Sequence, residues 1–496
     1  MLASDGVRAV ASVTARLWTR EIAELFRVSE RRVSLMVALG VATAIFFGVV
    51  LAIVGSSGLE PAMPVALRST LVGTSVGGAV MTSGIVATIV SISAPARTAL
   101  QTLLDLLPVS RTNAQVGQLL PLVGLALVFS VALSAVSFAV GFTISPSTVW
   151  SVGFTAALLA SIVLASIIVF GLFRVIRWCL IVGARLPHQY AVTVAGSMTL
   201  TLSVATVAPD IFALRIDNNG WEPRELLLHR ALASASVSNY GFAPWGVLLV
   251  WLAVGILAVR SLGWTATSDH GSGSTRALVG LSVPRTRAAA ATWVQVLAAV
   301  RSPQAIVTVL VIPALVAGAW LLSERPLLGS VAQVFAAAAP SVPFLLAMFA
   351  VGRVLPLRWW GAQLTARPTW WAWPTAVGHL LIGTIVAVPV VVVELALGTL
   401  QAADLGAVAA RAAFAFAAAL VAGALVPYSE EQPLSATISG FIAALLYTGN
   451  AVVTPVIADG LGTSAMPIVT ASTAVALLAL FGLIINRYAS HGDVRA

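Results

Sequence analysis

Apolar runs of about 20 residues recur along this chain, separated by short polar segments. An α-helix of that length is long enough to cross the hydrocarbon core of a bilayer. Only 9% of the 496 residues are charged, and the mean hydropathy is +1.00, whereas soluble domains carry about 25% charged residues. The sequence therefore predicts an all-α integral membrane protein.

Twelve segments meet this length criterion, and we predict that each one crosses the membrane. The first six are Val33–Val54, Thr70–Ser91, Leu119–Phe142, Thr148–Phe173, Ala191–Ile211 and Phe242–Val259. The second six are Ala305–Leu322, Val331–Val351, Ala376–Leu397, Ala407–Val426, Ala436–Val456 and Ile468–Ile485. The fifth span is rich in Thr and Ser, which suits a helix buried against its neighbours.

The distribution of arginine predicts the topology. All 27 basic residues are Arg, and with the N-terminus inside, 21 of them fall in cytoplasmic segments and 6 in outer ones. Cytoplasmic loops of membrane proteins carry such an excess of basic residues. We therefore expect both termini in the cytoplasm. The expected location of this multi-pass protein is the plasma membrane of a bacterium with a GC-rich genome. The excess of basic residues in cytoplasmic loops also explains the net charge of +9, so we expect no nucleic acid partner.

Each set of six spans follows a predicted amphipathic helix. From Val10 to Phe26, apolar residues that include Val13 and Leu17 alternate with charged ones, and Arg285–Arg301 is similar. We expect both helices at the cytoplasmic membrane surface, and the chain as a parallel six-plus-six pseudo-repeat. The predicted domains are an elbow helix at 1–32, a six-helix half at 33–262, a linker with a second elbow at 263–304, a six-helix half at 305–486 and a tail at 487–496.

Another amphipathic helix is predicted outside the cell. It would contain Leu226, Leu227, Leu228 and Leu232, between the fifth and sixth spans. We expect it to lie on the outer leaflet or to dip into it.

The polar passage between the second and third spans has the pattern of two short helices joined at a corner. Leu103, Leu104 and Leu107 are spaced for one apolar helix face. Pro108 ends that helix, and Ser110 is placed to cap a second helix that continues into the third span. The shape alone leaves two interpretations open, a docking element and an ordinary inner loop.

The residues of this passage resemble a known family. Leu106-Leu107-Pro108-Val109-Ser110-Arg111, followed by Gly117-Gln118-Leu119-Leu120, is similar to the LPVSR…GKLL passage of type-2 ATP-binding-cassette (ABC) exporter permeases, with Gln118 where the family usually has Lys. The resemblance implies a coupling helix that meets an ATPase subunit. The equivalent loop of the second half is Leu355–Pro374, where Arg358, Trp359 and Trp360 are the candidate coupling residues.

The absence of lysine bears on where ATP binds. A phosphate-binding P-loop needs a Lys after its glycines, and this chain has no Lys. We therefore expect a permease without its own ATP site, which is not itself an enzyme. The expected partners are two copies of an ATPase subunit that binds ATP and Mg, the membrane lipid and a small amphipathic substrate such as a drug, lipid or hydrophobic peptide.

Small residues and prolines suggest a substrate pathway. Gly73 and Gly77 place two small residues on one face of the second span, and Pro340 and Pro343 are predicted to break the eighth. Generic helix packing explains the glycines better than a substrate surface does. The tryptophans of Leu355–Pro374 favour an anchor at the membrane interface over a ligand site.

Charged residues inside the spans are few. Glu394 and Arg411 lie near the predicted outer ends of spans nine and ten, where we expect them to reach the interface or to pair with each other. His379 lies near the inner end of span nine. The alternative function, a twelve-span secondary transporter driven by protons, would need carboxylates within the membrane. A membrane-embedded enzyme would need an acidic site. The only acidic cluster consists of Asp210, Asp217, Glu222 and Glu225. With one cysteine, Cys179, and no group of His, Asp and Glu that offers a metal site, we expect no metal site and no catalytic residue.

Overall fold

The computed structural model describes residues 2–26, 28–56, 65–93, 110–145, 147–213, 226–237, 243–264, 282, 284–323, 329–355, 369–428, 435–461 and 465–492. All regular elements in these ranges are helices. The chain divides into two compact units, Met1–Ser272 and Gly273–Ala496. Their boundary falls within the predicted linker, and each unit begins with a predicted elbow helix.

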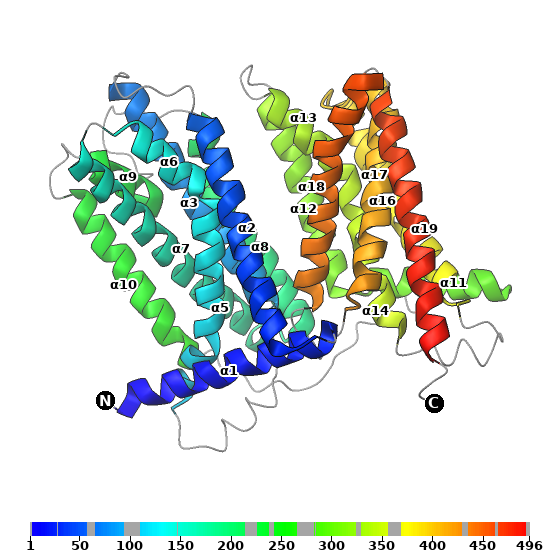
Figure 1. The fold of residues 1–496 in the computed structure, drawn as a ribbon, viewed down its shortest axis with the longest axis horizontal. Coiled ribbons are helices and arrows are strands. Elements are labelled where there is room, and N and C mark those ends of the chain that lie inside the picture. The colour runs from blue at the N-terminus through cyan, green and yellow to red at the C-terminus, as the bar shows by residue number, and fades with distance from the viewer. Residues whose placement is uncertain are drawn as a thin grey trace. The chain divides into compact units, whose positions relative to one another are not determined.

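The described residues of the first unit form nine helices (Figure 1). They are α1 (Leu2–Phe26), α2 (Glu30–Ser56), α3 (Val65–Ser93), α5 (Arg111–Leu133), α6 (Ala135–Thr143), α7 (Thr148–Val182), α8 (His188–Ala213), α9 (Leu228–Val237) and α10 (Ala243–Trp264). Helix α3 lies at the centre, packed against α5, α6, α7, α8 and α9. Its buried Val72 and Val76 meet Phe154, Leu158 and Ile162 of α7 in the main apolar cluster of this unit.

The polar fifth span is buried on one side only, and Thr201 is exposed. Helix α8 packs along α3, and Thr193, Ser197 and Thr199 are all buried. The hydroxyl groups of Ser197 and Thr199 donate to backbone carbonyls one turn earlier, those of Thr193 and Ala195. These local bonds satisfy the hydroxyls without a partner on another helix. Gly84 of α3 allows a close crossing, since an added Cβ there would lie 2.9 Å from Ser203 Oγ.

The second unit contains α11 (Arg287–Val300), α12 (Pro303–Ser323), α13 (Gly329–Ala338), the 3-10 helix η3 (Ala339–Phe349), α14 (Ala350–Val354), α16 (Ala372–Ala396), the short η5 (Ala402–Asp404), α17 (Leu405–Leu425), α18 (Ser435–Leu461) and α19 (Met466–Gly492). Helix α17 forms its centre and packs against α18, α19 and η3. From Phe414 to Ala424 every residue of α17 is buried. A helix that is apolar on all sides belongs in such a core.

The eighth span changes its helical form at the predicted prolines. The chain runs as α13, continues as η3 over 11 residues, and resumes as α14. Pro340 and Pro343 lie in η3, where each removes a backbone donor. Most of η3 is buried against α16 and α17, so the protein and not lipid surrounds the irregular backbone.

All twelve predicted spans coincide with helices. Within the described residues, nine helical segments are long and apolar enough to cross a membrane. The three other predicted spans lie in α2, α10 and α18, which are not among those nine. A multi-pass helical membrane protein is therefore supported, while the number twelve and the topology remain predictions.

Three predicted details were wrong. The third span is not one helix, because α5 ends at Leu133 and α6 starts after Ser134. Helix α7 continues to Val182, nine residues beyond the predicted end of the fourth span at Phe173. Helix α9 does not present its leucines to the outer leaflet, since Leu228 and Leu232 are buried against the protein core. Only Leu226 of this segment is exposed among those described.

We predict that Gly423→Ala destabilises the second unit. A Cβ at this position would overlap the backbone carbonyl oxygen of Met348 in η3, and backbone cannot rotate away as a side chain can. Overpacking of this kind costs about 1–3 kcal/mol, which should lower the midpoint of thermal unfolding in detergent. The control is Gly406→Ala on the same helix, where no atom lies within 4 Å. Equal midpoints for the two variants would contradict the prediction.

Candidate functional site

Most of the predicted coupling residues lie outside the described residues. This holds for Leu103, Leu104, Leu107 and Pro108, and also for Arg358, Trp359 and Trp360. Ser110 and the backbone of Arg111 are described. Ser110 is the N-cap of α5, and its Oγ accepts a hydrogen bond from the backbone N of Asn113 at 3.3 Å. The predicted cap is therefore confirmed, and α5 begins directly after the predicted coupling passage.

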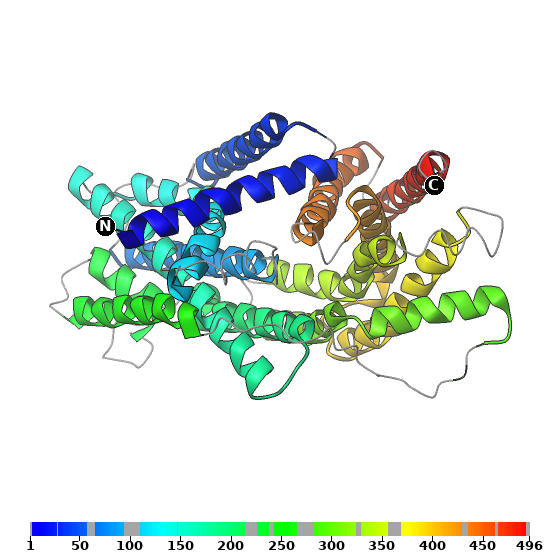
Figure 2. The same cartoon turned by 90° about the horizontal axis from the view of Figure 1, so that it is seen from below.

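The first elbow helix crosses α5 at a glycine. Helix α1 lies across the end of the long helices of its unit (Figure 1) and is seen lengthwise from below (Figure 2). A Cβ added to Gly117 would lie 2.7 Å from Cβ of Val10 and 3.0 Å from the carbonyl oxygen of Val7. Only glycine allows the two helices to lie this close.

The second elbow helix makes the corresponding contact in its own unit. Helix α11 packs against α16 and runs across it (Figure 1). A Cβ added to Gly378 would lie 2.7 Å from Cβ of Gln295 and 3.0 Å from the carbonyl oxygen of Thr292. Gly117 and Gly378 are each the seventh residue of their helix.

In each unit, the helix that receives the elbow helix is the one that follows a predicted coupling loop in the sequence. Helix α5 follows the passage that ends at Ser110, and α16 follows Leu355–Pro374. Sequence reasoning missed this contact, although a glycine near the start of an otherwise apolar span was visible in both halves.

The buried side of α1 differs from the predicted apolar side. Val10, Thr14 and Trp18 face the protein and are buried. Val13 and Leu17 are exposed, at 44% and 36%, and lie on the surface among the exposed Arg16 and Arg20. In a helix at a membrane surface, such a mixed outer side suits contact with lipid and headgroups.

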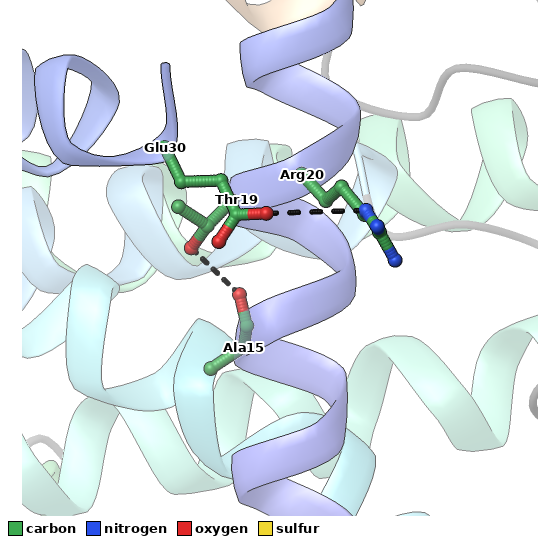
Figure 3. Close-up of polar contacts among 4 residues, drawn as sticks. All are labelled: Ala15, Thr19, Arg20 and Glu30. Carbon is green, nitrogen blue, oxygen red and sulfur yellow. Dashed lines mark hydrogen bonds and ion pairs between the residues drawn. The ribbon is translucent and has the colours of Figure 1, made fainter.

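An ion pair links α1 to α2 at their corner. The Nε of Arg20 lies 3.9 Å from Oε1 of Glu30, and both side chains are largely exposed (Figure 3). Thr19, one residue earlier, donates its hydroxyl to the carbonyl of Ala15. An exposed pair of this kind contributes about 0–1 kcal/mol, so packing at Gly117 determines the position of α1 more than this charge pair does.

Three proline-interrupted helices meet in the second unit. Ile312 of α12, Ala339 of η3 and Val390 of α16 pack together in one buried cluster. Each of these residues is the immediate neighbour of a proline in its helix, namely Pro313, Pro340 and Pro389. Each proline leaves a backbone carbonyl without its usual helical donor.

Glu394 lies one turn of α16 beyond this cluster, and the expectation that it reaches the interface was wrong. Its side chain has an exposed fraction of 0%, and neither carboxylate oxygen has a hydrogen-bond partner among the described residues. The suggested pair with Arg411 is absent too, since Arg411 is exposed and no ion pair joins the two. A carboxyl group in apolar surroundings without a partner is costly, and such groups in membrane proteins are usually functional.

Buried polar contacts lie at the end of each unit that is predicted to be cytoplasmic. In the second unit this is the end of α16 that lies away from Glu394. In the first unit, Nη1 of Arg174 donates to Oε1 of Gln115 at 3.0 Å, which joins α7 to α5. In the second, Nη2 of Arg353 donates to Oε1 of Gln304, which joins α14 to α12. Near Arg353 lies His379 of α16, which is 1% exposed and has its Nδ1 2.9 Å from the carbonyl oxygen of Thr375.

The predicted pathway residues have separate surroundings. Gly77 is buried and Gly73 is half-buried on α3, whereas Pro340 and Pro343 are buried in η3. The two pairs belong to different units, and their role in a pathway stays a prediction.

The tryptophans of Leu355–Pro374 also differ in burial, because Trp371 is buried in the core of the second unit and Trp373 is 70% exposed. Only the latter has the exposure expected of an interfacial anchor.

Comparisons with known proteins give no family assignment. No protein-family model, curated protein or solved structure matches this chain. Within the described part of the chain, no three His, Cys, Asp or Glu side chains form a possible metal site. The function of this chain is therefore inferred from its own residues and contacts.

We predict that Gly117→Leu loosens the contact between α1 and α5. The added side chain would collide with Val7 and Val10, so trypsin should cleave more readily at the exposed Arg8, Arg16 and Arg20 of α1. Limited digestion followed by mass spectrometry measures this. The control, Gly124→Leu, lies on the same helix with no atom within 4 Å. If both variants are cleaved like the unsubstituted protein, the glycine contact does not hold α1 in place.

Proposed function

We propose that this chain is the transmembrane permease subunit of an ABC exporter. It would move an amphipathic substrate, such as a drug, lipid or hydrophobic peptide, out of the cell. A separate ATPase subunit, present in two copies, would bind ATP and Mg and dock on the predicted cytoplasmic loops.

The observation that carries this proposal is the repeated elbow contact. In each unit, a surface-type helix rests through a glycine on the helix that follows a predicted coupling loop. A permease without its own ATP site needs a rigid route from its loops into its spans, and the starts of α5 and α16 provide one. The resemblance of the passage ending at Arg111 to ABC exporter permeases agrees with this role.

The substrate class follows from the spans. Within the nine candidate spans of the described chain, Glu394 and Asp404 are the acidic residues, and Asp404 is exposed. A pathway with so few acidic groups favours amphipathic molecules over sugars or inorganic cations.

A proton-driven secondary transporter is the second candidate, and the burial of Glu394 favours it. The sequence alone offered little support for a carboxylate that stays within the protein. The two candidates differ in their energy source. Transport by the purified chain alone, driven by a proton gradient, would support the second and reject the first.

We predict that Pro108→Ala combined with Arg111→Glu uncouples the chain from its ATPase. The ATPase should be encoded in a neighbouring reading frame, contain a P-loop and co-purify with this chain. Substrate-stimulated ATP hydrolysis should fall to the level of the ATPase alone, because the double change removes the corner and reverses the charge of the docking passage. Membrane insertion should be normal.

The matched control is Arg260→Glu. Arg260 is exposed at the end of α10, is predicted to be cytoplasmic and lies outside the coupling passage. It undergoes the same charge reversal, and stimulation should persist. Undiminished stimulation in the Pro108/Arg111 variant, or failure of any P-loop protein to co-purify, would count against the exporter.

A further inference from the structure

Glu394 is the one acidic side chain that the described candidate spans bury completely. Moving an ionised carboxylate into apolar surroundings without a partner is far more costly than moving the neutral acid. The charge must therefore be compensated, and no described residue donates a hydrogen bond or supplies a positive charge to its oxygens.

The helices packed against α16 carry few titratable groups. Among the described residues, the helices that pack most extensively against α16 are η3, α11, α12 and α14. Neither η3 nor α12 contains one, α14 contains Arg353, and α11 contains Arg287. Both α11 and α14 pack near the start of α16, around Ala372–Gly378. On α16 itself, His379 lies 15 residues before Glu394, about 22 Å away along the helix axis.

The segment that carries Glu394 is bounded by two backbone irregularities. Pro389 interrupts the hydrogen bonds of α16 five residues earlier, and Gly398 adopts a left-handed φ of +71° four residues later. The adjoining cluster of Ile312, Ala339 and Val390 is formed where α12 and η3 also contain prolines. Interrupted helices beside a buried charge are typical of coupling-ion sites in transporters.

A proton fits this site better than a larger cation. Both oxygens of Glu394 are enclosed by protein, so a hydrated metal ion or an ammonium group would have to displace side chains. A proton needs no cavity, and it neutralises the carboxylate directly.

We propose that Glu394 is a proton-binding site, at which the carboxylate takes up a proton from water when the segment Pro389–Gly398 opens and holds it when the segment closes. Transport by this chain is then sensitive to the proton gradient. This inference goes beyond the proposed function, because it concerns a site in the second unit that needs no ATPase.

Carbodiimide labelling tests the site directly. Dicyclohexylcarbodiimide, an apolar reagent, adds to protonated carboxyl groups in apolar surroundings, and mass spectrometry locates the product. In the full chain in liposomes, we expect Glu394 to be labelled at about pH 6, and each pH unit above the midpoint should lower the protonated fraction about tenfold. Absence of label at every pH between about 5 and 9 would overturn the proposal.

Matched variants make the result specific. Glu394→Gln should lose the label, and Glu394→Asp should keep it, because aspartate retains the carboxyl group. Asp404→Asn, which removes an exposed acid close by in the chain, should leave the label unchanged. If Na⁺ protects Glu394 from labelling at constant pH, a metal-cation site replaces the proton site.

A transport measurement adds a functional readout. Reconstituted Glu394→Gln should have the unfolding midpoint of the unsubstituted protein, and its transport rate should no longer change when a pH gradient is imposed. An unaltered response to the gradient in this variant would overturn the proposal. Labelling requires neither ATP nor a partner, so its failure leaves the exporter proposal intact, and failure of ATPase coupling leaves the labelling result intact.

Discussion

The structure depends first on the satisfaction of backbone hydrogen bonds in a medium without water. In a bilayer core, unpaired backbone groups are tolerated only where protein covers them. The long helices meet this requirement internally, and α17 does so at the centre of its unit. The 3-10 segment η3 departs from α-helical geometry, and it lies against α16 and α17 with Ala339, Phe344 and Ala347 buried. Its irregular backbone is thus placed where lipid does not reach it.

Close approach at glycine is the second principle of this fold. Gly383 of α16 makes room for the ring of Phe344, and Gly423 of α17 makes room for the backbone of η3. Gly117 and Gly378 do the same for the two elbow helices. Without a hydrophobic driving force between helices in lipid, such close packing is what holds them together. These glycines therefore support the packing within each unit.

The two ends of α16 have different chemistry. Its start receives α11 at Gly378 and carries His379 near Arg353, whereas its end carries Glu394 beyond a cluster of proline-interrupted helices. If ATP hydrolysis by a partner moves the start of α16, the same helix connects that movement to the buried carboxyl group. An exporter driven by ATP and a site sensitive to protons are therefore compatible within one unit.

The sequence by itself determined the helical membrane class, the positions of the helices, the two elbow helices, the Ser110 cap and the irregular eighth span, because apolar length, Pro and capping residues act locally. It did not determine which face of a helix meets protein, since lipid and core are equally apolar. For this reason Leu228 and Leu232 were assigned to the outer leaflet, and Glu394 was expected at the interface. Only tertiary packing decides those cases, because the burial of a side chain depends on which helices enclose it.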